Sequence, residues 1–203
     1  MTERKIFNTF TDCLAFIISA VFSPYVTAMV FVVAIIFNYS ENLGQFLPWM
    51  ITFLVFGLLI PGLYCLWLIE TGQITDYHIS KLAERRKPFI AAGLSALVGT
   101  IILIYMGAAR PVVVMAVVYT VNTMVVALIS QVWKISIHTA LFSAIVTVAI
   151  ILFGPVWGWC YLILIPLSWS RIHRKRHTIL QAVAGAMLAF ILTTVVFWLF
   201  GYF

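Results

Sequence analysis

The feature that most limits how this chain can fold is a series of apolar runs, most of them about twenty residues long, separated by short polar clusters. A run of about twenty apolar residues is what an α-helix needs to cross a lipid bilayer. Hydrophobic residues make up 64% of the 203 residues and charged residues only 9%, whereas about a quarter of a soluble domain is charged. The sequence therefore excludes a soluble enzyme or a disordered chain and predicts an integral membrane protein.

The polar clusters divide the chain into seven predicted membrane spans. In order, they cover roughly Cys13–Phe37, Phe46–Ile69, Pro88–Ala109, Pro111–Ser130, a run from the 131–138 junction to Gly154, Val156–Ser168 and Thr178–Phe203. The valine-rich fourth run would suit a strand in water, but an isolated strand in lipid leaves its backbone groups unpaired. We therefore expect an all-α, polytopic helical bundle. It would form one compact domain, with an N-terminal hairpin (1–75) before a core (76–203).

A few residues inside the predicted spans indicate how the helices bend and pack. Pro24 lies within the first run, and Pro61 lies within the second, where we expect a kink. Gly185 and Ala189 are four residues apart, so they offer a small-residue face for close helix packing. Asn122, in the fourth run, is predicted to form a hydrogen bond between helices. His78 and His173 are interpreted as loop residues with structural or solvated roles.

The basic residues predict the orientation of the protein in the membrane. If the spans alternate, the N-terminus and the polar clusters 70–87, 131–138 and 170–177 all lie on one side. That side holds Arg4, Lys5, Lys81, Arg85, Arg86, Lys87, Lys134, Arg171, Arg174, Lys175 and Arg176, and the other side holds Arg110. Because positive residues favour the cytoplasmic side, we expect a multi-pass protein of a bacterial or archaeal cytoplasmic membrane, with this side facing the cytoplasm.

Acidic residues and cysteines are too few and too scattered for a metal site. No Asp or Glu follows Glu84, although basic residues continue to Arg176. A Mg²⁺ or Ca²⁺ site needs several carboxylates. Cys13, Cys65 and Cys160 are isolated in apolar runs, which argues against a disulfide framework or a zinc site. We expect no metal, no other cofactor and no nucleic-acid partner.

Three polar clusters on the predicted basic side carry the candidate chemistry. Each contains cations, and the second and third also contain histidines at membrane depth, where ionisable groups are costly and usually functional. Lys134 stands one helical turn before His138. Lys and Arg without a carboxylate cluster suit phosphoryl transfer without a metal, because cations can neutralise the phosphoryl oxygens. One histidine would attack phosphorus, and another would protonate the leaving oxygen.

The same clusters resemble the motifs of the type 2 phosphatidic acid phosphatase superfamily. Ser170-Arg171-x5-His177 matches the third motif, Ser-Arg-x5-His-x3-Asp. The segment Lys134–His138 resembles a diverged second motif, Pro-Ser-Gly-His, and Ser80–Pro88 resembles a degraded first motif, Lys-x6-Arg-Pro. Order and spacing agree over roughly residues 76–190. Since the family usually has six spans, the resemblance implies six to seven transmembrane helices around a phosphatase-like core.

The resemblance also implies a role for each matching residue. His177 would be the nucleophile that forms a phosphohistidine, and His138 would be the general acid for the leaving group. Arg171 would clamp the phosphate, and Ser136 would donate a hydrogen bond to a phosphoryl oxygen. In the first cluster, Lys87 stands where the family has Arg, and Ser80 stands where the family has Lys, so Lys81 or Arg85 would replace that lysine. The remaining phosphate-binding candidates are therefore Lys81, Arg85 and Lys87, together with Lys134 from the second cluster. Spacing alone does not choose between Lys81 and Arg85.

The sequence departs from the family pattern at positions that affect catalysis. Gln181 stands where the family has the aspartate that orients the nucleophile. His177 and Gln181 are i and i+4 on a helix, so their side chains can meet. The glutamine oxygen can fix the ring through Nδ1, but it cannot stabilise an imidazolium by charge. Ile135 and Ile137 replace the proline and the glycine of the second motif.

Two functions from different classes follow. The first is a metal-independent membrane lipid phosphatase, which hydrolyses a lipid phosphate or an isoprenyl phosphate or diphosphate through a phosphohistidine. The second is a catalytically weakened relative that binds anionic lipid or a partner protein. A third possibility is a haem protein with His138 and His177 as ligands, which would be coloured. Composition also permits a transporter, but the sequence shows no inverted repeat.

Overall fold

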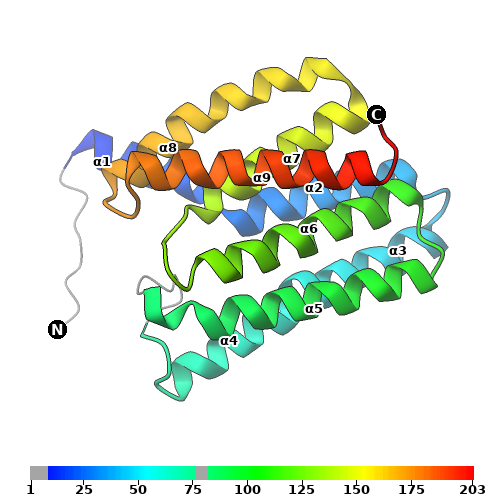
Figure 1. Cartoon of the computed structure of the whole chain (residues 1–203), viewed down its shortest axis with the longest axis horizontal. Helices are drawn as coiled ribbons and strands as arrows, with labels where there is room; N and C mark the ends of the chain where they lie inside the picture. Colours follow the sequence, from blue (N-terminus) through cyan, green and yellow to red (C-terminus); the bar gives the residue numbers. More distant parts are fainter. Residues whose placement is uncertain (1–8, 76–81) are drawn as a thin grey trace.

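The computed structural model describes residues 9–75 and 82–203 (Figure 1). The described residues form helices and no strand. The helices are α1 (Phe10–Val21), α2 (Pro24–Tyr39), α3 (Leu43–Phe53), η1 (Leu54–Leu59), α4 (Ile60–Glu70), η2 (Leu82–Glu84), α5 (Arg86–Tyr105), α6 (Arg110–Ile129), α7 (Ile137–Phe153), η3 (Pro155–Ile163), α8 (Leu164–His173) and α9 (Ile179–Leu199). They form one elongated bundle, in which successive long segments run in opposite directions.

Five segments are long and apolar enough to cross a membrane. They are Phe10–Tyr39, Leu43–Glu70, Arg86–Tyr105, Arg110–Ile129 and Ile179–Leu199, and Ile137–Phe153 is a shorter apolar helix. The valine-rich fourth run is helical, as predicted, because a helix satisfies its backbone groups internally. The structure thus agrees with a helical, multi-pass membrane protein.

The first predicted span consists of two helices. α1 ends at Val21, and Ser23 caps α2 by accepting a hydrogen bond from the Val26 amide. Pro24 occupies the first turn of α2, where the missing amide hydrogen costs no helical hydrogen bond. α1 packs against α8, whereas α2 packs against α7 and α3. The N-terminal segment therefore lies against the C-terminal half of the bundle.

Where the sequence predicts a kink, at Pro61, the structure has a π-helical segment, η1, between α3 and α4. Pro61 has no amide hydrogen to give to the preceding turn. The carbonyl oxygens of Phe56 and Gly57 instead accept hydrogen bonds from the hydroxyls of Ser95 (2.7 Å) and Tyr119 (3.1 Å). Helices α5 and α6 thus supply hydrogen-bond donors to the turn in which Pro61 has none. Lipid could not supply them.

Small and polar residues hold α7 against α9, and the close packing predicted at Gly185 is present. A Cβ added to Gly185 would lie 2.7 Å from the carbonyl oxygen of Ser136. The hydroxyl of Thr139 donates to the Ala182 carbonyl at 2.8 Å. Elsewhere, Asn122 donates to the Thr193 hydroxyl at 3.4 Å, which confirms the predicted hydrogen bond between helices.

The sixth predicted span is longer than expected. The 3₁₀ segment η3 and helix α8 together continue from Pro155 to His173, so the polar residues from Ser170 to His173 belong to the helix. The interpretation of His173 as a loop residue was therefore wrong. Arg and His side chains can reach the membrane interface while the helix that carries them continues. Their presence therefore did not mark the end of the helix. His78 lies outside the described residues.

The largest apolar core lies towards one end of the bundle. It includes Ile35, Trp49, Leu103, Val114 and Phe197, from five different helices. At the same end, Arg110 donates to the Phe200 carbonyl, and its guanidinium lies 5.2 Å from the centre of the Tyr202 ring. The largest apolar cluster thus lies towards this end, and the polar groups described next lie at the other.

Candidate functional site at the basic end

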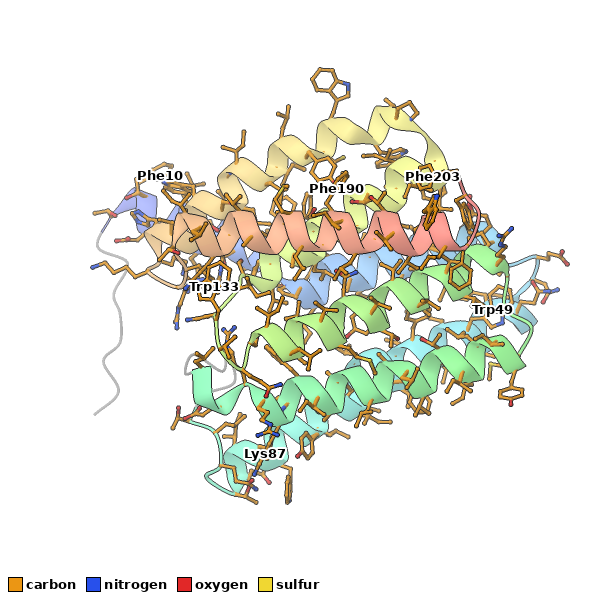
Figure 2. All side chains as sticks on the ribbon, in the orientation of Figure 1. Phe10, Trp49, Lys87, Trp133, Phe190 and Phe203 are labelled. Carbon is orange, nitrogen blue, oxygen red and sulfur yellow. The ribbon has the colours of Figure 1, made fainter. Side chains whose placement is uncertain are left out.

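The basic residues collect at the end of the bundle where α1, α5, α7 and α9 begin and α4, α6 and α8 end. We call this the basic end. Its described cations are Arg85, Arg86, Lys87, Lys134, Arg171, Arg174, Lys175 and Arg176. Figure 2 shows Phe10, Lys87 and Trp133 at this end, and Trp49 and Phe203 at the opposite end. The three polar clusters predicted from the sequence therefore share one end of the molecule within the described residues.

His177 lies just before α9, in the turn that follows α8. Its backbone amide donates to the Arg171 carbonyl at 3.4 Å. Its Nδ1 lies 3.3 Å from Oε1 of Gln181. The predicted contact between positions 177 and 181 is thus confirmed.

Gln181 has a structural task besides this contact. Its Oε1 accepts a hydrogen bond from the Thr178 amide at 3.1 Å, while the Thr178 hydroxyl accepts one from the Gln181 amide at 3.3 Å. These reciprocal bonds form a capping box at the start of α9. The Thr178 amide needs an acceptor, and in the Gln181 side chain only the oxygen can accept, because the NH₂ group is a donor. The side-chain amide of Gln181 therefore has a fixed orientation.

This orientation fixes the protonation pattern of the neutral His177 ring. An amide oxygen can only accept a hydrogen bond, so Nδ1 of His177 must carry the hydrogen that it donates to Gln181. Nε2 then keeps its lone pair. A neutral imidazole with a free Nε2 lone pair can act as a nucleophile or as a base.

Burial and positive charge keep His177 neutral. Burial lowers the pKa of its imidazole most, and the charges of Arg171, Lys134 and Arg85 lower it further. The hydrogen bond with Gln181 acts in the opposite direction, and the net result is a pKa of about 3 instead of 6.5. The three cations come from the α8, 131–136 and α5 regions of the chain, so the fold brings one residue of each predicted cluster into electrostatic range of His177.

Arg171 is held from the side of α1. Its Nη1 donates to the hydroxyl of Ser19 at 2.6 Å. Its Nε is buried, and no hydrogen-bond partner lies near it among the described residues. The positive charges of Arg174, Arg176 and Arg85 also act on Arg171. A buried N–H donor among like charges is costly to leave unsatisfied, so the position favours an anion.

Arg85 is the buried cation among the described residues of the first cluster. Only 3% of its surface is exposed. Its Nη1 lies 3.5 Å from the Ile135 carbonyl, beside the second cluster, and its guanidinium lies 5.7 Å from the centre of the Phe89 ring. A nearly buried arginine that faces the second and third clusters suits the phosphate-binding role left open between Lys81 and Arg85.

The other candidates of the first cluster lie elsewhere. Lys87 is exposed, and its Nζ lies 2.5 Å from Oε1 of Gln73, in the turn after α4. It is not among the charges that act on His177. Lys81 lies outside the described residues.

The second cluster forms the start of α7. Ser136 caps the helix by accepting from the Thr139 amide at 3.5 Å, and its own backbone amide donates to the Gln181 carbonyl at 3.2 Å. His138 follows in the first turn and is half-buried, like Lys134 before it. The starts of α7 and α9 therefore meet, and both histidines lie at the basic end.

Ser136 has a structural role that the sequence did not indicate. Its exposed fraction is 0%, and its hydroxyl serves as the helix cap. The amide groups at the start of α7 supply partial positive charge at the same place. A hydrogen bond from the Ser136 hydroxyl to a phosphoryl oxygen stays a prediction from the resemblance.

The contribution of α1 to the site was not predicted from the sequence. Besides the contact of Ser19 with Arg171, Oδ1 of Asp12 lies 2.9 Å from Nε2 of His173, and the His173 ring stacks on Trp169. The guanidinium of Arg174 lies 5.1 Å from the centre of the Phe16 ring. Asp12 and Ser19 are seven residues apart, which is the helical spacing of one face. This spacing was the one available signal.

The donor set around His177 suits an anion. Within residues 9–75 and 82–203, His, Cys, Asp and Glu side chains form no group of three that could hold a metal ion. The charged groups that act on His177 are all cations. Buried guanidinium groups, an ammonium and helix starts are the groups that proteins use for phosphate.

Comparisons with known proteins gave no relative. The chain matches no protein-family model, no curated protein and no solved structure.

Proposed function

We propose that the protein is a metal-independent membrane lipid phosphatase, related to the type 2 phosphatidic acid phosphatases, with His177 as its nucleophile. The substrate would be a lipid phosphate or an isoprenyl phosphate or diphosphate. The observation that carries the proposal is the gathering of Arg85, Lys134 and Arg171 in electrostatic range of a neutral His177. Three cations from three distant segments are costly to bring together unless an anion neutralises them.

The proposed reaction has two steps. In the first, the Nε2 lone pair of His177 attacks phosphorus, a P–N bond forms, and the bond from phosphorus to the leaving oxygen breaks. His138 gives a proton to that oxygen. In the second step, water attacks phosphorus and gives a proton to His138, which restores it. Inorganic phosphate leaves, and the P–N bonding pair returns to Nε2. The cations stabilise the charge on the phosphoryl oxygens in both steps, which is the task of a metal in other phosphatases.

The membrane geometry suits a substrate with an apolar tail. The tail would lie in the bilayer beside the apolar helices, and the headgroup would reach the basic end. On this proposal the chain crosses the membrane seven times, because η3 and α8 together return it to the basic end after α7. The excess of cations at that end favours its placement on the cytoplasmic side.

One observation favours the second candidate, a relative that binds an anionic lipid or a partner without turnover. Oε1 of Gln181 is shared between the Thr178 amide and His177, so glutamine serves the helix cap well whether or not the protein is an enzyme. It lacks the charge that would stabilise a phosphorylated imidazolium. The cations would then hold a phosphate group that is not hydrolysed.

The test is phosphate release by the full-length protein in the presence of EDTA. Wild-type protein should release inorganic phosphate from a lipid phosphomonoester, and His177→Ala should abolish the release. Lys175→Asn is a matched control: it removes one charge from the same turn, and asparagine tolerates the positive φ of 52° at this position. It should retain most of the activity.

The outcomes separate the two candidates. Undiminished release by the His177 variant would reject the nucleophile. Absence of release for every lipid phosphate in a panel, with the lipid still bound, would reject the phosphatase and favour the second candidate.

A further inference from the structure

An apolar groove lies on the outer face of the bundle, between the η1–α4 segment and α5. Its volume is about 360 Å³. It is lined by Phe56, Ile60, Ala91, Leu94, Ser95 and Val98. Ile60, Leu94 and Val98 are each between 41% and 55% exposed, so the groove opens outward to the lipid.

The polar groups around the groove are already satisfied, which leaves an apolar surface. The hydroxyl of Ser95 donates to the Phe56 carbonyl at 2.7 Å, so neither group needs a ligand. A Cβ on Gly99 would lie 2.7 Å from Cβ of Phe56. The two walls are therefore in contact at Gly99, beside the groove.

A cation lies at the other end of the same face of α5. Lys87, Ala91, Leu94 and Val98 have the spacing i, i+4, i+7 and i+11, which places them in one row along the helix. Nζ of Lys87 lies 2.5 Å from Oε1 of Gln73, which follows α4, so this contact joins the ends of the two walls. Among the described carboxylates, none forms an ion pair with Lys87.

The length of this row matches one leaflet of a bilayer. Eleven residues of α-helix, from Lys87 to Val98, extend about 16 Å, and half of the hydrocarbon core of a bilayer is about 15 Å. Lys87 lies at the basic end of the bundle, which is where a lipid headgroup would lie.

We infer that this groove binds the acyl chain of an anionic phospholipid whose headgroup contacts Lys87. The site is distinct from the candidate phosphatase site. Arg85 and Lys87 are two residues apart, about 200° around a helix, and Arg85 is buried towards the second cluster while Lys87 is exposed. The phospholipid would seal the seam between the π-helical segment and α5, and it need not be a substrate.

The experiment measures lipid retained on the full-length protein. The protein is equilibrated with equal amounts of phosphatidylglycerol and phosphatidylcholine in detergent, and bound lipid is counted by native mass spectrometry. Wild-type protein should retain phosphatidylglycerol preferentially. Lys87→Gln should lower that preference about fivefold, since one lysine near a lipid headgroup is worth about that factor.

Two bulky variants test the groove itself. Ala91→Trp and Leu94→Trp fill it and should reduce retention of phosphatidylglycerol about fivefold or more. Leu97→Trp is the matched control, because Leu97 is 39% exposed on the same helix but does not line the groove. It should behave like wild type.

The inference fails if either groove variant retains as much phosphatidylglycerol as Leu97→Trp, or if wild type retains both lipids equally. Phosphatidylglycerol is a phosphodiester, so a phosphatase for phosphomonoesters does not consume it. The result is therefore independent of the proposed enzyme activity, and His177→Ala should retain the lipid as wild type does.

Discussion

The side chain of Gln181 both caps helix α9 and contacts the candidate nucleophile, His177. Its Oε1 accepts hydrogen bonds from the Thr178 amide and from Nδ1 of His177. The cap needs only an oxygen at this position, and glutamate supplies one as well as glutamine does. Negative charge there would stabilise the positively charged ring of a phosphohistidine. The two requirements can therefore be separated by one substitution.

Gln181→Glu should keep the helix cap and add charge beside His177. The carboxylate would stabilise the positively charged ring, so we expect turnover to rise about tenfold or more, in the direction of the large effects seen when such a carboxylate is removed. The measurement is the rate of phosphate release, with thermal unfolding as a check on the cap. An unchanged rate with an intact fold would show that charge at this position does not limit the reaction.

The protonation of His177 is the second prediction at the residue scale. Because the pKa of this imidazole is about 3, its ¹⁵N resonances should show a neutral ring at pH 5. Lys134→Gln removes one of the charges that lower the pKa, so the pKa should rise but stay below 6.5, since burial is the larger cause. A wild-type midpoint between pH 6 and 7 would contradict this account.

The same shift affects stability. The unfolded chain binds a proton at position 177 near the usual pKa of 6.5, whereas the folded protein does so near 3. Between these values the unfolded state binds more protons, so the free energy of unfolding should fall as the pH falls from about 6.5 towards 3. His177→Ala should weaken this dependence in a denaturation series measured against pH.

Sequence reasoning at this scale identified His177, Arg171, Lys134 and Arg85 as candidates, and the structure gathers the cations around the histidine. The sequence did not show that Arg85 is buried and Lys87 exposed. That difference depends on which side of the chain faces the bundle where α5 begins, and a degraded motif does not carry this information. The contact of Ser19 with Arg171 was missed because it joins residues from opposite ends of the sequence.

At the scale of helices, the contact between α7 and α9 positions the site. Gly185 allows the start of α9 to lie against Ser136. Gly185→Val should force the helices apart and destabilise the protein by about 1–3 kcal/mol, with a loss of whatever activity the site has. Gly158→Ala is the control, since its new Cβ would lie 3.8 Å from Cδ1 of Ile150, an ordinary contact. Equal unfolding temperatures for the two variants would contradict the argument.

The π-helical segment allows a test by a double-mutant cycle. Tyr119→Phe removes the donor to the Gly57 carbonyl and should cost about 0.6 kcal/mol, a typical value for such bonds in membranes. Pro61→Ala restores an amide that can serve the same turn. In that background the tyrosine substitution should cost less, as measured by unfolding in detergent. An equal cost in both backgrounds would show that the hydrogen bond from Tyr119 does not compensate for the amide that Pro61 lacks.

The positions of the helices were predicted well from composition, but the breaks and ends of helices, which depend on local geometry, were predicted less well. Long apolar runs located most helices, because lipid leaves the backbone no other choice. The break at Ser23-Pro24 and the π-helix before Pro61 were visible only as prolines within a run. The continuation of α8 to His173 was missed because polar residues were taken to end the helix.

At the scale of the molecule, the charges divide the bundle into two unlike ends. The described cations lie at the basic end except Arg110, which binds the C-terminal turn at the other end. If the chain crosses the membrane seven times, as we propose, tags at the two termini should lie on opposite sides of the membrane. Protease protection of each tag in sealed vesicles measures this. Equal protection of both tags would require an even number of crossings.

The proposed phosphatase mechanism depends on the attack of His177 on a phosphoryl group held by the cations around it. The most direct measurement is to mix full-length protein with a ³²P-labelled lipid phosphomonoester in EDTA, stop the reaction in alkali within one turnover, and locate the label. We predict label on the peptide that contains His177, stable in alkali and lost in acid, and none on the His177→Asn variant. Release of phosphate by that variant at the wild-type rate would contradict the account.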